Sequence, residues 1–409
     1  MADDQGSAPS VPKSVIEVTA FMPEARRDPH PPLKALRENC PVMRDEMAKA
    51  WFLTRYGDVR TTVNDRSFIR HPLNAEEGSI SRQLVDEENP RRTSILFMDN
   101  PDHARVRPPL AKAFYARINK MKDQIEAIVD ETIEAAPASG VFDLMEEIAV
   151  PIPVTVIARI LGVDEERLAD FRDWSEAVIL GLNPVRTPEE TERMMAGGAA
   201  LEAYFAELME RRREAPADDL ITDMVQLQAS GDAPLSDDEV RINLQALLVG
   251  GNLTTTDLIG NGVWLFLNHP EQLAALKADP GLASQAVEEV LRFEAPVSAT
   301  SRIAEADKPV AGCPVKEHQV VFCSLASANR DAETFEAPDT FDITQKRASH
   351  VAFGGGPHIC IGAPLARMEA RRVYQKLFER YPDMKLPEQD IAWRALPFFR
   401  GIETLLVEV

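Results

Sequence analysis

The segment that most constrains the fold is a long apolar helix predicted to begin after Ser236. Ser236 and Glu239 have the spacing of a capping box, and Leu235 and Val240 stand where a hydrophobic staple packs. The helical pattern continues to about Leu267, so the helix would contain about 32 residues and extend ~48 Å. Because it is apolar around much of its circumference, it must cross a whole domain with other elements packed around it.

The other segments predict a mainly α fold with small β-sheets. Helical periodicity recurs through the middle of the chain, whereas strand-like runs occur early, at Trp51–Thr54, and late, at Val320–Cys323 and Glu403–Val407. No repeat or shift in composition divides the chain, so we expect a single domain over residues 15–409. Residues 1–14 are rich in Pro, Ser and Asp, and we expect them to be disordered.

Composition excludes several classes of protein. A formal net charge of −21 over 409 residues argues against a nucleic-acid-binding protein and against an acidic membrane surface as a partner. The cysteines Cys40, Cys313, Cys323 and Cys360 are far apart and form no C-x-x-C pair, so neither a disulfide framework nor a zinc site is indicated. The first residues are acidic and no apolar run reaches the roughly 18 residues of a membrane span. We therefore expect a cytoplasmic protein.

A glycine-rich loop places Cys360 just before a predicted helix that runs from Pro364 to about Tyr381. The positive end of a helix dipole and free backbone N–H groups stabilise a thiolate, so this position should lower the pKa of the cysteine. Glycines at 354, 355, 356 and 362 let the backbone pass close to a flat ligand. Taken alone, the residue could also be a buried structural cysteine beside a turn.

The same loop resembles the haem-binding loop of cytochromes P450, whose pattern is F-x-x-G-x-H/R-x-C-x-G. The five matching residues are Phe353, Gly356, His358, Cys360 and Gly362. Further matches to the soluble bacterial class, at Asn329-Arg330-Asp331 and Phe341-Asp342, extend the resemblance from about Trp51 to Val407. It implies the P450 fold, with haem b (iron protoporphyrin IX) between the long central helix and the cysteine loop. Cys360 would be the thiolate ligand of the iron and favour O–O bond cleavage.

The resemblance also implies residues that hold the haem. His103 and Arg107 are four residues apart on one helical face, a suitable fork for a carboxylate, although two surface charges would look the same. With Arg302 and His358 they are implied as partners of the two haem propionates. The remaining residues implied at the cofactor are Phe353, Gly354, Gly362 and Gly250.

Glu289 and Arg292 form the E-x-x-R pattern that is a buried structural pair in proteins of this family. Alone, the spacing is equally that of a solvated surface pair. In the loop that follows, Gln345 stands where the family usually has an arginine. Either Arg347 substitutes for it or the network is altered.

The stretch Gly250-Gly251-Asn252-Leu253-Thr254-Thr255 in the long helix resembles the oxygen-activating sequence A/G-G-x-D/E-T-T. The resemblance implies that Gly251, Asn252 and Thr254 act at the dioxygen site, where a local helix distortion makes room and the threonine hydroxyl helps deliver a proton. Leu253 replaces the usual acid and cannot relay a proton. Asp257, one turn on, could do so, but we expect it to be a solvated or structurally paired residue.

The pocket implied by the resemblance is mostly apolar and suits a small hydrophobic or aromatic substrate. Its walls would come from residues 72–97, 178–182, 247–251, 297–300 and 397–399. Arg70, His71 or Arg82 could hold a substrate carboxylate, but we expect these side chains to be solvated.

Electrons would come from NAD(P)H through a separate reductase and a small acidic ferredoxin, since 409 residues leave no room for a reductase domain. Such a partner requires a basic docking surface near the cysteine. The candidates are Arg105, Lys112, Lys346, Arg347, Arg367, Arg371 and Arg372.

The function that these observations favour is a monooxygenase that inserts one oxygen atom from O2 by hydroxylation, O-dealkylation or epoxidation. Two alternatives are a peroxide-driven or rearranging P450, suggested by Leu253, and a haem-binding sensor or carrier without turnover, against which Thr254 argues. The sequence leaves the substrate, the ferredoxin and the oligomeric state open.

Cys360→Ser should leave a mostly folded chain without oxygenase activity. It should also remove the red-shifted absorption band of the reduced, carbon monoxide-bound protein, because alkoxide or water cannot supply the electron donation of a thiolate. Serine at Cys40, Cys313 or Cys323 should leave the band in place. A band that survives in Cys360→Ser and disappears in one of the other three variants would overturn the ligand assignment.

Overall fold

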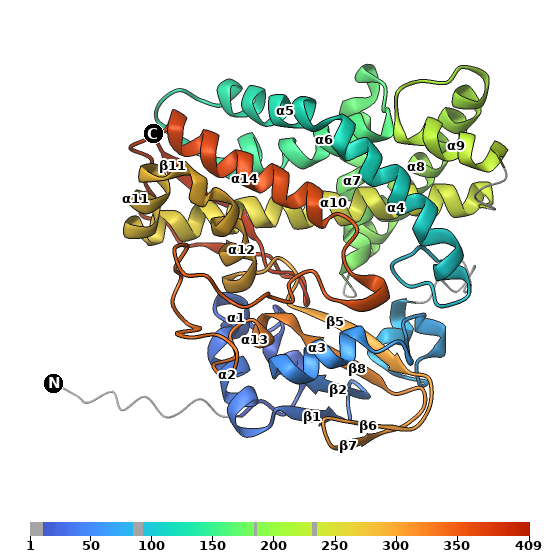
Figure 1. Ribbon diagram of the computed structural model, residues 1–409, viewed down its shortest axis with the longest axis vertical. Helices are drawn as coiled ribbons and strands as arrows, with labels where there is room; N and C mark the ends of the chain where they lie inside the picture. Colours follow the sequence, from blue (N-terminus) through green and yellow to red (C-terminus); the bar gives the residue numbers. More distant parts are fainter. Residues whose placement is uncertain (1–10, 85–92, 184–185, 231–234) are drawn as a thin grey trace.

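The computed structural model describes residues 11–84, 93–183, 186–230 and 235–409. It is predominantly helical with small sheets, as the sequence predicts. Most helices gather in the upper part of the molecule, and the largest sheet lies with several short helices in the lower part (Figure 1). The helices are α1 (Pro23–Arg27), α2 (His30–Asn39), α3 (Tyr56–Asn64), α4 (Asp102–Lys120), α5 (Lys122–Ala135), α6 (Pro151–Leu161), α7 (Leu168–Ile179), α8 (Pro188–Glu214), α9 (Leu220–Ser230), α10 (Asp237–Asn268), α11 (Pro270–Ala278), α12 (Ala283–Phe293), α13 (Leu325–Ala328) and α14 (Ala363–Arg380).

Helix α10 is the long helix predicted from the capping box. Ser236 Oγ accepts from the Glu239 N–H at 3.2 Å, and a Glu239 carboxylate oxygen accepts from the Ser236 N–H at 2.8 Å. From residue 252 to residue 263, only Thr254 is not buried. Glycine lets neighbours approach this helix closely, since a Cβ at Gly262 would lie 1.9 Å from the hydroxyl of Tyr374 in α14. That hydroxyl donates to the Leu258 carbonyl at 2.6 Å, which fixes α14 against α10.

The main sheet has the strand order β1-β2-β8-β5-β3. Strands β2 and β8 are parallel, and the other neighbours are antiparallel. Two predicted strands are confirmed as β2 and β8, whereas the predicted strand at 403–407 is split between β10 and β11 at Leu405. The strands are β1 (Val42–Asp45), β2 (Ala50–Leu53), β3 (Phe68–Ile69), β4 (Val141–Asp143), β5 (Ala299–Ala304), β6 (Lys308–Val310), β7 (Cys313–Val315), β8 (Val320–Ser324), β9 (Ala392–Trp393), β10 (Ile402–Thr404) and β11 (Leu406–Glu408).

The predicted disordered terminus lies mostly outside the described residues, which begin at residue 11. Ser14, at its end, is buried, and its hydroxyl donates to Asp45 at 2.7 Å. None of the helices in the described part of the chain combines the length and apolar character needed to cross a bilayer.

A buried ionic cluster joins α12 to the loop between α13 and the cysteine. Arg292 donates two hydrogen bonds of 2.7 Å to the carboxylate of Glu289, and the side chains are 1% and 3% exposed. Arg347 Nε lies 3.1 Å from the same carboxylate. Arg347 therefore occupies the role left open at Gln345, and the solvated surface pair is excluded. The Arg292 guanidinium also donates to the carbonyls of Asn329, Pro338 and Thr340, which ties the loop to α12.

Glu289→Gln should lower the free energy of unfolding by about 3–5 kcal/mol, because it leaves two buried guanidinium groups without their carboxylate. The matched control is Glu176→Gln, which breaks an exposed pair with Arg172 and should cost about 0–1 kcal/mol. Urea unfolding followed by circular dichroism, at equal haem content, measures both. Equal costs in the two variants would contradict a structural role for the buried cluster.

Candidate active site

The cysteine loop is a tight turn held against the end of α3. The Cys360 N–H donates to the Phe353 carbonyl at 3.0 Å, which closes the turn. Gly354 and Gly356 have φ of 70° and 65°, a conformation that favours glycine. A Cβ at Gly356 would lie 2.5 Å from the Val63 carbonyl oxygen, and the Gly356 N–H donates to Asn64 Oδ1 at 2.8 Å. These contacts fix the cysteine at the start of α14.

Cys360 is a free and exposed cysteine. Although one side of the residue is open, the surrounding protein raises the pKa of its thiol, while the N–H groups of Gly362 and Ala363 and the charge of Arg107 oppose the rise. The expectation that the helix end would lower this pKa is therefore wrong for the polypeptide alone, because desolvation outweighs the amides. A metal ion bonded to sulfur deprotonates a thiol outright, which removes the difficulty.

The rings of two of the predicted haem contacts, His103 and His358, lie against each other at an interplanar angle of 41°. Their ring centroids are 4.2 Å apart, and His103 Nε2 and His358 Nδ1 are buried without a hydrogen-bond partner. Burial, aided by the charge of Arg107, lowers the pKa of His103 to about 4. Two adjacent imidazoles with orphaned nitrogens indicate that a polar group of a ligand belongs beside them.

Two buried arginines accompany the histidines. Arg302 is 2% exposed and donates to the carbonyls of Val63 and Gly355 at 2.9 and 3.2 Å. Arg70 is 8% exposed, and its Nε has no partner. The solvated Arg70 expected from the sequence is therefore wrong: it is buried after β3, and burial, then Arg302, lowers its pKa to about 9. No sequence motif marks Arg70, because its burial depends on the pairing of β3 with β5.

We call Arg70, His103, Arg302 and His358 the nitrogen cluster. Within the described residues, no carboxylate forms an ion pair with any of the four. Buried cations without a counter-charge are costly, so the cluster fits an anionic ligand. The two propionates of a haem are such a ligand, and the exposed Cys360 thiol supplies the sulfur that the iron would need.

The other predicted residues of this region form hydrogen bonds with nearby backbone groups. The Arg107 guanidinium donates to the Ile359 carbonyl, so it ties α4 to the cysteine loop. His71 Nδ1 accepts from the Leu73 N–H at 3.2 Å, and Arg82 donates to the Leu73 carbonyl. Part of the predicted 72–97 wall, residues 85–92, lies outside the described residues.

Of the predicted dioxygen-site residues on α10, Gly250, Gly251 and Thr254 are at least partly exposed, whereas Asn252 is buried. The Thr254 hydroxyl donates to the Gly250 carbonyl at 2.6 Å, and a Cβ at Gly250 or Gly251 would meet open space. Asn252 is buried, as is Leu253, which is 5% exposed but belongs to none of the apolar clusters of the described residues. The helix is continuous from Asp237 to Asn268, so the expected local distortion is not present in this structure.

Asp257 is a structurally paired residue, one of the two roles expected for it. Its Oδ1 accepts from Arg394 at 3.1 Å, and a Cβ at Gly401 would collide with the carboxylate. Oδ2 is buried without a partner, and burial raises the pKa of Asp257 to about 6. The carboxylate is therefore committed to the contact with the 394–401 segment.

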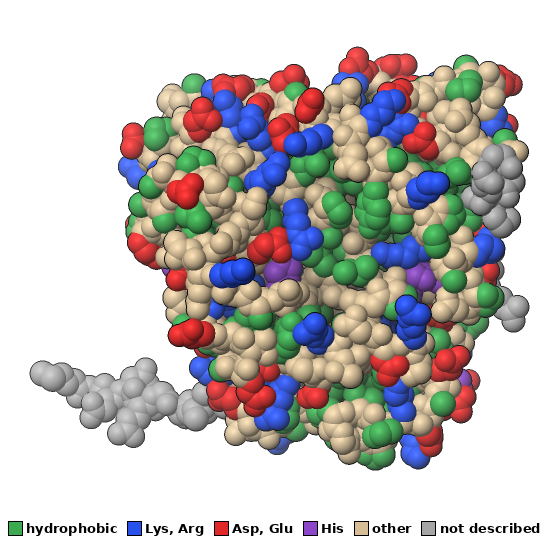
Figure 2. All heavy atoms as spheres, viewed as in Figure 1, with side chains coloured by type: hydrophobic (Ala, Val, Ile, Leu, Met, Phe, Trp, Pro, Cys, Tyr) green, Lys and Arg blue, Asp and Glu red, His purple; other side chains and the backbone are tan. Residues whose placement is uncertain are grey.

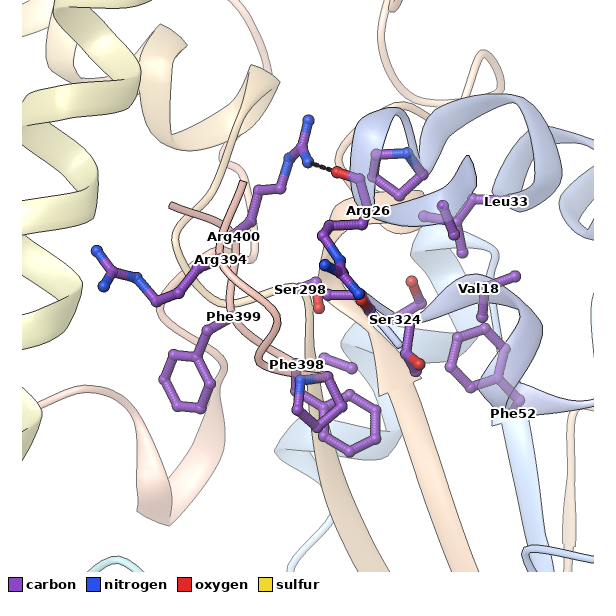
Figure 3. Close-up of a pocket in the computed structure, with 16 residues that line it drawn as sticks. Val18, Arg26, Leu33, Phe52, Ser298, Ser324, Arg394, Phe398, Phe399 and Arg400 are labelled. Atoms are coloured by element: carbon purple, nitrogen blue, oxygen red, sulfur yellow. Dashed lines mark hydrogen bonds between the residues drawn. The ribbon is translucent and has the colours of Figure 1, made fainter. Parts of the chain in front are cut away.

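Two predicted substrate walls meet beside the sheet. The Ser298 N–H donates to the Phe398 carbonyl at 3.0 Å, and Val297 and Phe399 pair as an isolated antiparallel β-bridge. Phe398 lies on the side of Phe52, whereas Phe399 lies on the other side of its loop (Figure 3). The Phe398 side borders a small pocket of about 30 Å³ that is partly open to solvent. One short loop therefore supplies an aromatic ring to each of two faces.

The predicted docking surface is more neutral than the sequence suggests. On the face that carries α4 and α14, Lys and Arg side chains are spread over the middle, and most acidic groups lie toward the upper and lower margins (Figure 2). Five of the seven predicted cations form ion pairs: Arg105 with Glu239, Arg347 with Glu289, Arg367 with Glu288, Arg371 with Glu126 and Arg372 with Asp130. Arg347 is only 6% exposed and cannot dock a partner, which corrects that assignment. Lys112 and Lys346 are exposed.

Comparison with known proteins agrees with this geometry. A family model described as Cytochrome P450 matches residues 281–394. The chain is 37% identical over 406 residues to Cytochrome P450 107B1 of Saccharopolyspora erythraea, covering 96% of this chain and 98% of that protein. It is 35% identical to Vitamin D(3) 25-hydroxylase of Pseudonocardia autotrophica, covering 93% and 94%. The crystal structure of CYP109E1 from Bacillus megaterium with corticosterone matches with a TM-score of 0.84 at 32% identity, covering 94% of this chain and 99% of that one.

Asp257→Asn should change how stability depends on pH. A folded pKa of about 6 exceeds the unfolded value, so the fold favours the protonated carboxyl, and wild type loses stability as the pH rises from about 4 to 6. The variant has no such loss and should gain roughly 2–3 kcal/mol relative to wild type over that interval. Urea unfolding at pH 4, 5, 6 and 7 measures this gain. Parallel curves for the two proteins would show that the carboxyl does not titrate in this range.

Proposed function

The chain belongs to the cytochrome P450 monooxygenases, and from this premise we propose that it inserts one atom of dioxygen into a small hydrophobic or aromatic molecule. The observation that carries the proposal is the nitrogen cluster, which contains buried cations and no carboxylate, in a chain that also exposes a free cysteine at the start of α14. Buried cations without a counter-charge would be unfavourable in a protein that held no anionic ligand.

Haem b would supply the activation of dioxygen, with Cys360 as the sulfur donor to its iron. His103, Arg302 and His358 would hold the propionates by N–H donation. Phe353, Gly354 and Gly362 shape the loop on the cysteine side, and Gly250 leaves open space on α10. Arg107 would also hold a propionate, because one of its N–H groups donates to the Ile359 carbonyl and the other guanidinium donors remain.

Thr254 is the proposed proton-handling group. In its present rotamer the hydroxyl donates to Gly250 O, so its oxygen lone pairs remain available to accept a hydrogen bond from water. Delivery of a proton then requires the hydroxyl to turn away from the carbonyl. Since Leu253 cannot relay a proton and Asp257 is bound to Arg394, the supply would come from water, with Gly251 providing space and Asn252 a nearby amide.

The proposed substrate class rests on the apolar character of the walls and on two of the relatives. One relative is named as a hydroxylase of vitamin D(3), and the similar structure holds corticosterone. Both are small molecules built mainly of apolar rings. We infer a substrate of this kind for the present chain, held by burial of apolar surface around residues 297–300 and 397–399.

Electrons would reach the site from NAD(P)H through a reductase and a ferredoxin in the cytoplasm. The proposed docking face carries α4 and the cysteine loop, with Lys112 and Lys346 as exposed cations. Because most other cations there are already paired with acids, electrostatic attraction of an acidic ferredoxin should be moderate and easily screened by salt.

Leu253 favours a second candidate, a peroxide-driven P450. Hydrogen peroxide brings both oxygen atoms, both electrons and the protons, so such a reaction does not depend on the relay that Leu253 lacks. The two candidates differ in which oxidant sustains turnover: O2 with a ferredoxin system, or peroxide alone.

Leu253→Asp should increase the product formed per NAD(P)H and decrease the hydrogen peroxide released, and Thr254→Ala should do the reverse. General acid catalysis typically contributes ~10²–10⁴-fold to a rate, so the missing acid should lower the amount of product formed per NAD(P)H consumed. The substitution is feasible because Leu253 lies outside the apolar clusters.

The measurement quantifies the product formed, the hydrogen peroxide released and the NAD(P)H consumed, with a substrate that fully shifts the spin state of the haem iron. Asp257→Asn is the control and should leave coupling unchanged. If wild type is already tightly coupled and Leu253→Asp alters neither quantity, the proton path does not pass this position. Sustained turnover with peroxide but not with O2 would favour the second candidate.

A further inference from the structure

We propose that Arg70 binds a haem propionate and adds, beside Arg302, a positive charge to the site that the two propionates would occupy. The inference rests on the proposed function, because it assumes that haem is the ligand. It adds a residue that the sequence motifs do not mark.

Strand pairing places the two arginines opposite each other. Strands β3 and β5 are antiparallel, with Phe68 opposite Ala304 and Ile69 opposite Ile303. Continuing that register by one residue sets Arg70 opposite Arg302, and directly opposed residues project from the same face of a sheet. Like charges at opposed positions are destabilising. The fold therefore brings together two cations that a bound anion would stabilise.

Asp99, the carboxylate that contacts the backbone of Arg70, already accepts three hydrogen bonds. Asp99 accepts from the backbone N–H of Arg70 at 2.6 Å, from the N–H of His71 at 3.0 Å and from the side chain of Asn74 at 3.3 Å. It forms no ion pair with the Arg70 guanidinium in the described residues. The carboxylate thus positions the backbone at residue 70 and favours the Arg70 charge from a distance, but forms no direct ion pair with the guanidinium in the described chain.

The Arg70 side chain is held in place but keeps its donors free. Its guanidinium lies 5.5 Å from the Phe97 ring centroid, which covers it on one side. Arg302, by contrast, donates to the carbonyls of Ser301, Val63 and Gly355. Within the described chain, no hydrogen bond involves the Arg70 guanidinium, and its Nε is buried. Arg70 is therefore the better placed of the two to form new hydrogen bonds with a carboxylate.

The neighbours of Arg70 favour a propionate over a substrate carboxylate. Its charge acts on His103 and on Arg302, both implied at the propionates. Arg302 donates to three backbone carbonyls and Arg107 to that of Ile359, whereas no described group accepts from the Arg70 guanidinium. Arg70 therefore brings a cation with free donors to the site where the two negative charges of the propionates are expected.

The test is the rate of haem transfer from holoenzyme to an acceptor globin, for wild type, Arg70→Gln and Arg70→Lys. The control is Arg60→Gln, which removes an exposed arginine from α3. Each protein is studied with ordinary haem and after reconstitution with haem dimethyl ester, whose propionates carry no charge. We expect Arg70→Gln to lose ordinary haem roughly 10-fold faster or more, with partial recovery in Arg70→Lys. With the dimethyl ester, Arg70→Gln and wild type should lose haem at the same rate.

Three results would overturn the proposal. Unchanged loss of ordinary haem in Arg70→Gln would remove Arg70 from the propionate site. Equal acceleration with both haems would assign a structural role instead. Unchanged haem loss together with weaker binding of palmitate, measured by spin shift, would make Arg70 a substrate anchor. Failure of the haem assignment is distinct, since wild type would then hold no haem before any Arg70 variant was compared. Failure of oxygen insertion alone would leave the haem-loss rates unaffected.

Discussion

The buried carboxylate of Glu289 is the interaction on which the position of the cysteine loop depends. It fixes Arg292, whose remaining N–H groups hold three carbonyls of the segment that leads to the loop. One of these residues, Asn329, accepts from the Val351 N–H at 2.8 Å, two residues before the loop begins. A continuous path of hydrogen bonds thus runs from α12 to the cysteine. Loss of the carboxylate would release the loop as well as leave charges unpaired.

The second constraint is electrostatic and works against the fold until the ligand is bound. The structure gathers Arg70, Arg302, His103 and His358 in a buried region and gives them no carboxylate in the part of the chain that it describes. A ligand that binds only the folded state stabilises it in proportion to its affinity. Haem binding and folding should therefore be strongly linked. This explains why these buried cations have no direct ion pair with an acid of the described chain.

Much of the fold could be predicted from the sequence because its signals are local. The capping box at Ser236 and the glycines before Cys360 each determine their own conformation, and both predicted helices form. Contacts that depend on packing between distant parts of the chain could not be predicted from the sequence. Arg70 has no motif, and its burial follows from the pairing of β3 with β5. The predicted lowering of the Cys360 pKa is wrong for the same reason, since desolvation by the surrounding protein is a tertiary effect.

The proposed function requires that Cys360 bonds an iron whose porphyrin is held by the nitrogen cluster. X-ray absorption at the iron edge of the purified protein measures this bond, because sulfur and nitrogen neighbours scatter differently. We expect one sulfur and a set of nitrogen neighbours in wild type and in Cys323→Ser, with the sulfur absent in Cys360→Ser. An iron surrounded only by nitrogen and oxygen in wild type, or a sulfur that persists without Cys360, would contradict it.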